Sequence, residues 1–322
     1  MSVEKIGGVM VRWFSKRVQS LIVAGSLLFG CLAHAADEDR CFSRRNEDRP
    51  QLRSEPVLCS YEPNTVGWTK DSDDVGFMDF KLSVRYQIFP FPKEGENWAT
   101  YFAFTGRFAQ YIGTRDSSPV VAKRFNPKIF FRRWADDKHG DYVDLGYNHE
   151  SNGQSIHTLP QFQQAQQDAQ RPEFAKDQIS RGWDFLELVW KKEWPGDASS
   201  TYLVLKYFLH HGLLQGRPEE FGTNFAETDP EGKPRKQVNG VGAIYKRFLS
   251  DAFCMTEKCK FAATYETGYR NPARYNTFRL EYGFKVQHLP LTVWGQSGYG
   301  SDLAQYYKKV SSLGFQVEIG SF

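Results

Sequence analysis

The sequence predicts an all-β fold, a transmembrane antiparallel β-barrel, on three observations. Segments of about ten residues alternate between apolar and polar side chains, as barrel strands do between lipid and a polar lumen. The chain of 322 residues contains 26 Phe, 16 Tyr and 8 Trp, yet its mean hydropathy is only −0.56. A barrel hides its apolar residues in such an average because every second residue along a strand is polar. Only one apolar stretch, near the N-terminus, approaches the length of a membrane helix, which argues against a helical membrane protein.

That apolar stretch is expected to belong to a secretory signal at residues 1–35. Basic residues come first, an apolar run follows at residues 21–32, and residues 33–35 read A-H-A, an A-x-A cleavage site. A transmembrane anchor and a lipoprotein site at Cys31 are the alternatives. The segment contains four basic residues and one acidic residue, which account for the whole net charge of +3. So small and scattered a charge excludes nucleic acid as an expected partner.

Residues 36–75 are charged and irregular, and are expected to form an N-terminal extension before a barrel at residues 76–322. Removal of the signal would leave four cysteines: Cys41, Cys59, Cys254 and Cys259. An even number of cysteines in an exported chain indicates disulfides. Pairing of nearest neighbours would join the first two and the last two, although the sequence leaves the connectivity open. The spacing matches no zinc site built from cysteine.

The strand pattern is clearest in residues 78–88, where apolar and polar residues alternate throughout. A strand of about 11 residues is long for a soluble protein and matches a tilted transmembrane strand. Charged residues on the polar faces, such as Arg279 and Glu281, would fit a sandwich core poorly but suit a polar lumen. The chain has room for roughly ten to twelve strands, and such barrels have even numbers. The pattern recurs in three later segments: residues 203–209, 277–286 and 313–319.

Two segments interrupt the strand pattern and are expected to be loops. One is the glutamine-rich stretch of residues 161–170, and the other is the polar stretch of residues 218–236. Tyr and Trp near the strand ends are expected to form girdles at the membrane interfaces. The chain ends in Phe322 just after an amphipathic strand, which resembles the assembly signal of outer-membrane barrels.

Residues 141–153 place a histidine and a serine at the end of an apolar row. By parity, the apolar residues from Val143 to Tyr147 share one face of a strand, and His149 and Ser151 continue that face. A histidine on a lipid-facing row is costly unless it has a use. The alternative is that the strand has already left the membrane, so that His149 is an ordinary loop residue.

A second strand supports the functional interpretation. In residues 182–190, Asp184 heads another apolar row of one parity. If the two strands are antiparallel neighbours, Asp184 arrives beside His149. Ser151 would then be a nucleophile, His149 its base, and Asp184 the carboxylate that holds the imidazole and stabilises its cation. Gly153 would give a backbone N–H to an oxyanion.

These residues resemble the signature of the outer membrane phospholipase A family. The family motif N-H-x-S-N-G-x-S matches residues 148–155, and S-R-x-W-N is similar to residues 180–184, which read S-R-G-W-D. The resemblance also reaches residues 117–119 and 297–301, and covers most of residues 60–322. It implies a twelve-stranded barrel in the bacterial outer membrane, with an active site on the outer wall.

The resemblance also implies the chemistry. It makes the chain a calcium-dependent phospholipase A, active as a homodimer, that hydrolyses acyl esters of glycerophospholipids, with the serine, histidine and glycine in the roles given above. The metal ligands would be the backbone carbonyl of Gln154, the side chain of Ser180, and Ser117 of the partner subunit. Oxygen ligands of this kind suit Ca²⁺, whose charge would polarise the oxyanion through bound water.

Two departures from the family pattern stand out. The third residue of the site is Asn in the family and Asp184 here, although other serine hydrolases use Asp in this role. A long insertion separates Ser155 from Ser180, and Ile156 replaces an acidic residue linked to a second calcium site, so no second site is expected. The departures leave an alternative, a non-enzymatic barrel that is either a narrow pore or an inactive structural homologue. A pore would place its functional charges inward.

Overall fold

The computed structural model describes residues 58–73, 75–89, 97–112, 122–135, 140–169, 172–194, 198–214, 234–249, 254 and 259–319. The expected signal at residues 1–35 lies outside them. The first strands are β1 (Leu58–Ser60), β2 (Asn64–Asp71), β3 (Gly76–Phe89), β4 (Trp98–Tyr111), β5 (Ala122–Trp134), β6 (Tyr142–Ser151) and β7 (Gly182–Trp194). The others are β8 (Ser199–Phe208), β9 (Val241–Leu249), β10 (Cys259–Thr267), β11 (Thr277–Val286), β12 (Leu289–Gly298) and β13 (Val310–Ile319). The helical segments are α2 (Leu159–Asp168), the 3-10 helix η1 (Pro172–Gln178) and α4 (Arg235–Val238).

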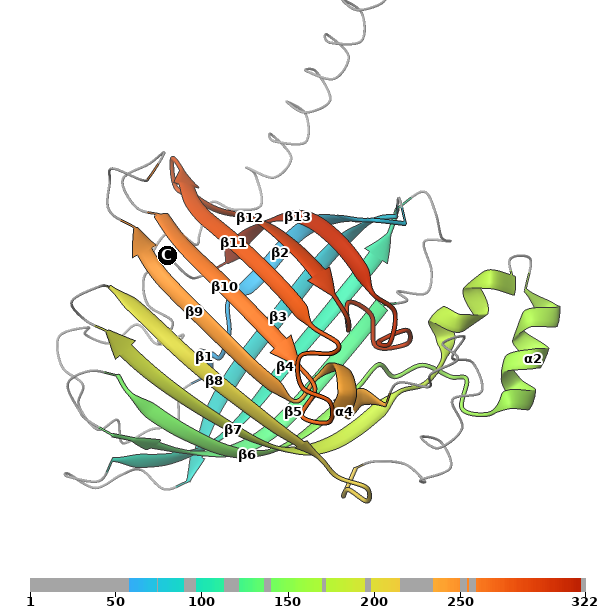
Figure 1. The fold of residues 1–322 in the computed structure, drawn as a ribbon, viewed down its shortest axis with the longest axis horizontal. Helices are drawn as coiled ribbons and strands as arrows, with labels where there is room; N and C mark the ends of the chain where they lie inside the picture. Colours follow the sequence, from blue (N-terminus) through green and yellow to red (C-terminus); the bar gives the residue numbers. More distant parts are fainter. Residues whose placement is uncertain are drawn as a thin grey trace, which may run out of the picture.

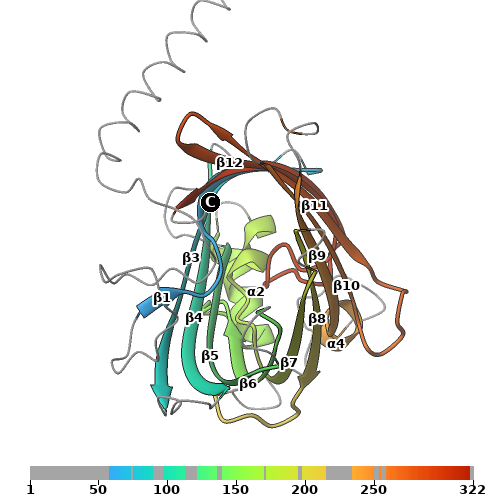
Figure 2. The same ribbon diagram turned by 90° about the vertical axis from the view of Figure 1, so that its left-hand side faces the viewer.

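Twelve strands of the described chain, β2 to β13, form a closed antiparallel barrel, which confirms the predicted fold. Each strand pairs with its neighbours in the chain, and β13 pairs with β2 to close the ring. Figure 1 shows the barrel from the side, and Figure 2 looks along it, with α2 seen at the far end. The short β1 pairs with β3 beyond the end of β2. Among the described residues, no helix is long and apolar enough to cross a membrane.

The barrel begins earlier than predicted, because β2 lies within the segment expected to be an N-terminal extension. Val66 and Trp68 pair with Val317 and Phe315 on the outer face of β13, while the residues between them face the lumen. The outward residues of β2 give too short an apolar pattern to predict a strand, since Lys70 interrupts the pattern after two apolar residues. The predicted boundary at residue 76 is therefore wrong.

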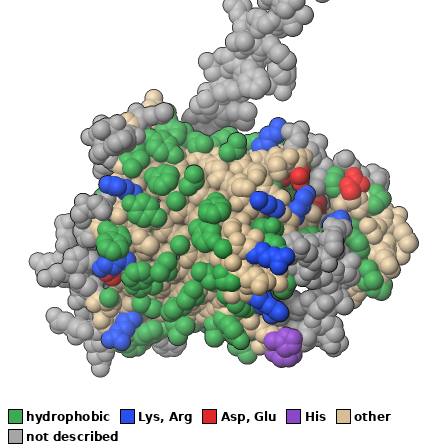
Figure 3. Space-filling view, in the orientation of Figure 1, with side chains coloured by type: hydrophobic (Ala, Val, Ile, Leu, Met, Phe, Trp, Pro, Cys, Tyr) green, Lys and Arg blue, Asp and Glu red, His purple; other side chains and the backbone are tan. Residues whose placement is uncertain are grey.

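The outer face of the barrel is apolar. On the face seen in Figure 3, hydrophobic side chains spread over the middle of β8 to β12, and Lys and Arg side chains lie toward the two ends. The alternation of the sequence thus separates the two faces as predicted. Exposed outward residues include Leu82, Ile129, Leu145, Leu188, Leu205, Leu280, Val293 and Phe315.

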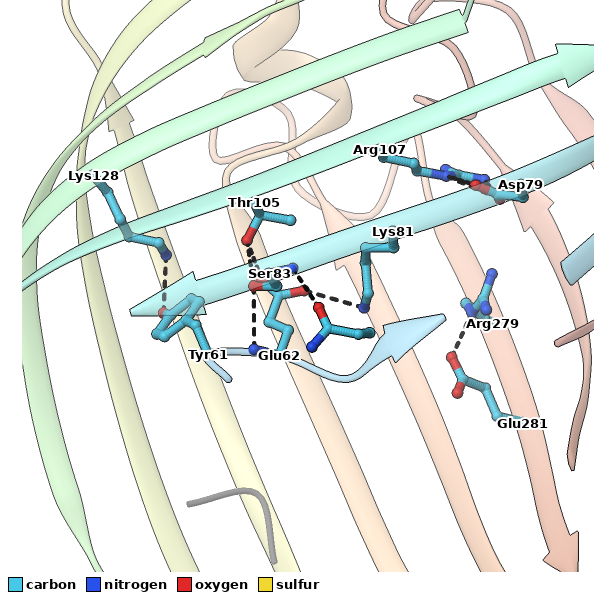
Figure 4. Close-up of polar contacts among 11 residues, drawn as sticks. Tyr61, Glu62, Asp79, Lys81, Ser83, Thr105, Arg107, Lys128, Arg279 and Glu281 are labelled. Carbon is cyan, nitrogen blue, oxygen red and sulfur yellow. Dashed lines mark hydrogen bonds and ion pairs between the residues drawn. The ribbon is translucent and has the colours of Figure 1, made fainter. Parts of the chain in front are cut away.

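The lumen contains paired charges and hydrogen-bonded polar groups. Lys128 Nζ lies 2.8 Å from a carboxylate oxygen of Glu187 and donates to the Tyr61 hydroxyl at 2.9 Å. Arg279 pairs with Glu281 at 2.5 Å. Figure 4 shows such side chains meeting inside the barrel from different strands. Pairing of this kind offsets the desolvation of the charges that the polar faces bring inside.

Loops cover the end of the barrel that carries the connection between β12 and β13. Tyr306 and Tyr307 of the β12–β13 loop pack with Val238 and Tyr275 in a buried cluster. In the same loop, burial raises the pKa of Asp302 to about 6, while the backbone N–H of Ala304 opposes that rise. The loops therefore pack against one another rather than standing open.

One disulfide joins Cys254 and Cys259 in the connection between β9 and β10, as pairing of nearest neighbours predicts. Cys59 is also disulfide-bonded. Cys41, its predicted partner, lies outside the described residues.

We predict that removal of one member of a buried lumen pair destabilises the barrel. Arg132 and Asp144 face each other on β5 and β6, with bidentate distances of 2.7 and 2.9 Å, and both are buried. Arg132→Met leaves the carboxylate unpaired and is expected to lower the free energy of unfolding by about 3 kcal/mol. The double variant Arg132→Met/Asp144→Leu should recover most of that loss. Urea unfolding in detergent measures both, and equal losses in the single and double variants would contradict the prediction.

Candidate active site

The candidate site is built on the pairing of β6 with β7. His149 lies directly opposite Asp184, and Ser151 lies opposite Gly182. The His149 Nδ1 atom is 2.6 Å from the Asp184 Oδ1 atom. The side chains of His149 and Asp184 lie on the outward faces of their strands, which also carry the exposed Leu145 and Leu188. The structure therefore brings histidine, serine and carboxylate to the outer wall of the barrel.

Asp184 is completely buried, although it lies on the outer wall. Its Oδ2 atom accepts hydrogen bonds from the Tyr147 hydroxyl and from the Leu214 backbone N–H, the latter at 2.8 Å. The side chain of His149 remains 16% exposed. A buried carboxylate with several donors holds the imidazole by one ring nitrogen and leaves the other ring edge available.

Gly182 keeps space between the serine and the histidine. A β-carbon placed on Gly182 would lie 3.5 Å from the Ser151 Cβ atom and 3.6 Å from the His149 Cε1 atom. A β-carbon there would be in ordinary van der Waals contact with both side chains. Gly182 therefore lies beside the serine and the histidine on the neighbouring strand.

Gly153 follows the end of β6 with a φ of +58°, in the left-handed region that favours glycine. The ring of Phe125 lies 3.4 Å from the position of a β-carbon there. The turn carries the chain away from the strand two residues after Ser151. Gly153, the oxyanion donor that the sequence predicts, thus lies in a turn two residues after the serine.

Asn152 joins this turn to the chain that leads into β7. Its side-chain amide donates to the Ile179 carbonyl at 2.7 Å, and its Oδ1 atom accepts from the Arg181 N–H at 2.9 Å. These two contacts lie on either side of Ser180, whose own N–H donates to the Ile156 carbonyl at 2.8 Å. The hydrogen bonds hold Ser180 next to the turn that contains Gln154.

The insertion between the turn and β7 is largely helical, so the loop expected at residues 161–170 is wrong. Thr158 and Gln161 form a reciprocal capping box at the start of α2, with Pro160 in the first turn. Phe162 of α2 packs with Ile156, Ala175 and Ile179 in a small core. Four glutamines of α2 are exposed: Gln161, Gln163, Gln164 and Gln167.

Comparison with known proteins supports the fold. No family model and no curated relative matches the chain. The solved structure of outer membrane phospholipase A from Escherichia coli is similar, with a TM-score of 0.59, 18% identity, and coverage of 86% of this chain and 95% of that chain. The dimer of outer membrane phospholipase from Salmonella typhi, with bound calcium, has a TM-score of 0.60, 18% identity, and coverage of 84% and 95%.

The barrel has the fold of outer membrane phospholipase A. At 18% sequence identity, the similarity to these structures shows the fold alone. The geometry of the site comes from the chain itself.

The predicted calcium ligands are only partly within the described chain. Gln154 is buried and Ser180 is half-buried, and the Asn152 contacts place them on adjacent segments. Both offer oxygen, the donor that Ca²⁺ prefers, so the residues present fit the ion. Ser117 lies outside the described residues. Within the described chain, no group of three His, Cys, Asp or Glu side chains is placed to hold a metal.

Sequence reasoning missed two parts of the site. By parity Tyr147 is an outward apolar residue, yet its hydroxyl donates to the Asp184 carboxylate. Its position two residues before His149 on the same face was the available signal. The segment at residues 209–214, which covers Asp184, carries no pattern that would have placed it there.

We predict that Asn152 holds the insertion against the barrel. Asn152→Ala leaves the Ile179 carbonyl and the Arg181 N–H without their side-chain partner, which costs about 2 kcal/mol. Hydrogen exchange of the Arg181 amide should become about 30-fold faster. Gln164→Ala on the exposed face of α2 is the matched control and should leave that amide unchanged. Equal exchange in both variants would rule out the bridging role.

Proposed function

We propose that the chain is a calcium-dependent phospholipase of the bacterial outer membrane, which hydrolyses acyl esters of glycerophospholipids. The observation that carries the proposal is the contact of His149 with buried Asp184 on the outer wall of a barrel with this fold. His149 lies two residues before Ser151 on the same strand. A pore would be expected to place its functional charged side chains toward the lumen instead. The similar structures from E. coli and S. typhi support the same substrate class.

The residues divide the reaction in the manner of a serine hydrolase. Ser151 Oγ attacks the ester carbonyl while His149 takes its proton, and the tetrahedral intermediate collapses to an acyl-enzyme. His149 gives the proton to the departing alcohol of the lysophospholipid. It then accepts a proton from the water that attacks the acyl-enzyme, and returns that proton to Ser151 Oγ as the fatty acid leaves. Asp184 holds the imidazole in the productive tautomer and stabilises its cation.

The oxyanion has two expected sources of stabilisation. Gly153 follows the serine by two residues, in the turn after β6, and its backbone N–H would donate to the developing charge. Calcium held by Gln154, Ser180, and Ser117 of the partner subunit would supply positive charge beside it. A ligand set shared between subunits makes the homodimer the active form.

The position of the site fits a membrane substrate. His149 and Ser151 continue the outer row that carries Leu145, at the end of β6. A lipid that diffuses in the leaflet would meet the serine without entering the lumen. The lumen instead contains ion pairs, and loops pack together at one end. This arrangement supports the enzyme over the narrow pore.

We predict that Ser151→Ala abolishes hydrolysis of phospholipid in mixed micelles, with a loss of at least about 1,000-fold in kcat. Ser311→Ala, which removes another outward hydroxyl from the barrel wall, is the matched control and should keep wild-type activity. A chelator should abolish wild-type activity, and added calcium should restore it. Hydrolysis that survives Ser151→Ala, or that ignores the chelator, would refute the mechanism.

A further inference from the structure

The chain after β8 folds over the outer side of Asp184. The Leu209 N–H donates to the Asp184 backbone carbonyl at 2.9 Å, and the Leu214 N–H donates to Oδ2 at 2.8 Å. The Leu213 N–H donates to the Tyr147 hydroxyl oxygen at 2.6 Å, and that hydroxyl in turn donates to Oδ2. We call Tyr147 together with residues 209–214 the clamp. The clamp and His149 thus share one carboxylate.

The clamp requires glycine at its closest approach. A β-carbon on Gly212 would lie 1.9 Å from the Asp184 Oδ2 atom and 2.2 Å from its Cβ atom. No side chain fits at that separation, so alanine would force the segment away from the carboxylate. The contact therefore depends on a backbone passing directly against Asp184.

The hydrogen bonds of the clamp fit a carboxylate and not an amide. Oδ1 faces His149, and Oδ2 accepts from a hydroxyl and from an N–H. An asparagine that kept its oxygen toward His149 would turn its amino group toward the Leu214 N–H, which would place two donors together. This chain's aspartate, where the family pattern has asparagine, matches the clamp. Donors on both oxygens also offset the desolvation of a fully buried charge.

The clamp exposes two leucines, together with His210 and His211. Leu213 is 86% exposed and Leu214 is 61% exposed, whereas Asp184 beneath them is 0% exposed. Tyr207 and Leu205, on the outward row of β8 that leads into the clamp, are 63% and 49% exposed. The two leucines are therefore continuous with the apolar outer face of the barrel. Hydrocarbon chains of membrane lipid are the partner that such a face fits.

We propose that the clamp is a positioning device for Asp184 that is anchored in lipid. The proposal rests on the proposed function and extends it. Tyr147 and the backbone N–H of Leu214 align the carboxylate on His149, and the side chains of Leu213 and Leu214 hold the segment in place by contact with lipid chains. Contact with lipid thereby reaches the histidine through backbone hydrogen bonds. Tyr147 and Gly212 are positioning residues, since neither meets the reacting atoms.

The first test loosens the clamp at its hydrogen bonds. Tyr147→Phe removes the hydroxyl, and Gly212→Ala displaces the segment. Both variants should lower kcat about tenfold with KM unchanged, and both should accelerate exchange of the Leu214 amide about tenfold. Gly242→Ala, at a strand glycine where a β-carbon meets only ordinary contacts beyond 3.4 Å, is the matched control and should change neither. Barrel folding is checked by resistance to SDS without heating.

The second test removes the lipid anchor. Leu213→Ser/Leu214→Ser is compared with Leu280→Ser/Leu313→Ser, which changes two exposed leucines of other strands. In nanodiscs of ether-linked phosphatidylethanolamine, which offers no ester to cleave, the clamp pair should accelerate exchange of the Leu209 amide about tenfold. In mixed micelles of ester lipid, the same pair should lower kcat about tenfold. The control pair should do neither.

The outcomes separate the two proposals. Accelerated exchange with unchanged kcat in Tyr147→Phe and Gly212→Ala would overturn the positioning role. Equal behaviour of the two leucine pairs would overturn the lipid anchor. A wild-type protein without hydrolase activity would refute the proposed function, and exchange of the Leu209 and Leu214 amides would then decide the clamp alone: unchanged exchange overturns it, and accelerated exchange supports it.

Discussion

Closure of the sheet is the constraint on which the rest of the structure depends. Each strand from β2 to β13 is paired on both sides, so a strand cannot slip by one residue without disturbing its neighbours. A slip would turn every outward side chain inward. The meeting of His149 with Asp184 on the outer wall therefore follows from the register of β6 and β7, and that register is held by the whole ring.

Features set by local periodicity could be predicted from the sequence. The separation of apolar and polar faces depends only on the alternation of residues along each strand. The placement of His149, Ser151 and Asp184 on one face of the sheet depends in addition on the antiparallel pairing of neighbouring strands. Where periodicity is weak, prediction failed. β2 has only two apolar outward residues before Lys70. The many glutamines of α2 hide its helical periodicity, although its capping box is recognisable in the sequence.

The contacts around Asp184 lie beyond sequence reasoning for a different reason. Gly212 touches a residue 28 positions earlier in the chain through a segment with no period, and its role depends on a backbone passing against a carboxylate. Tyr147 has the apolar character of its row but uses its hydroxyl. Such contacts are set by the path of the chain between strands, which residue type alone does not specify.

The insertion also has a consequence for how the protein can be altered. Its two ends are held side by side, because the Ile156 N–H donates to Gln178 and the Ser180 N–H donates to Ile156. The stem joins the insertion to the barrel, and the Gln305 side chain of the β12–β13 loop adds a second contact by donating to Asp177. The exposed face of α2, which contains Gln163, Gln164 and Gln167, is thus a permissive attachment point. A fluorophore or an epitope can be grafted there, in the segment that follows β6, while the strand register stays intact.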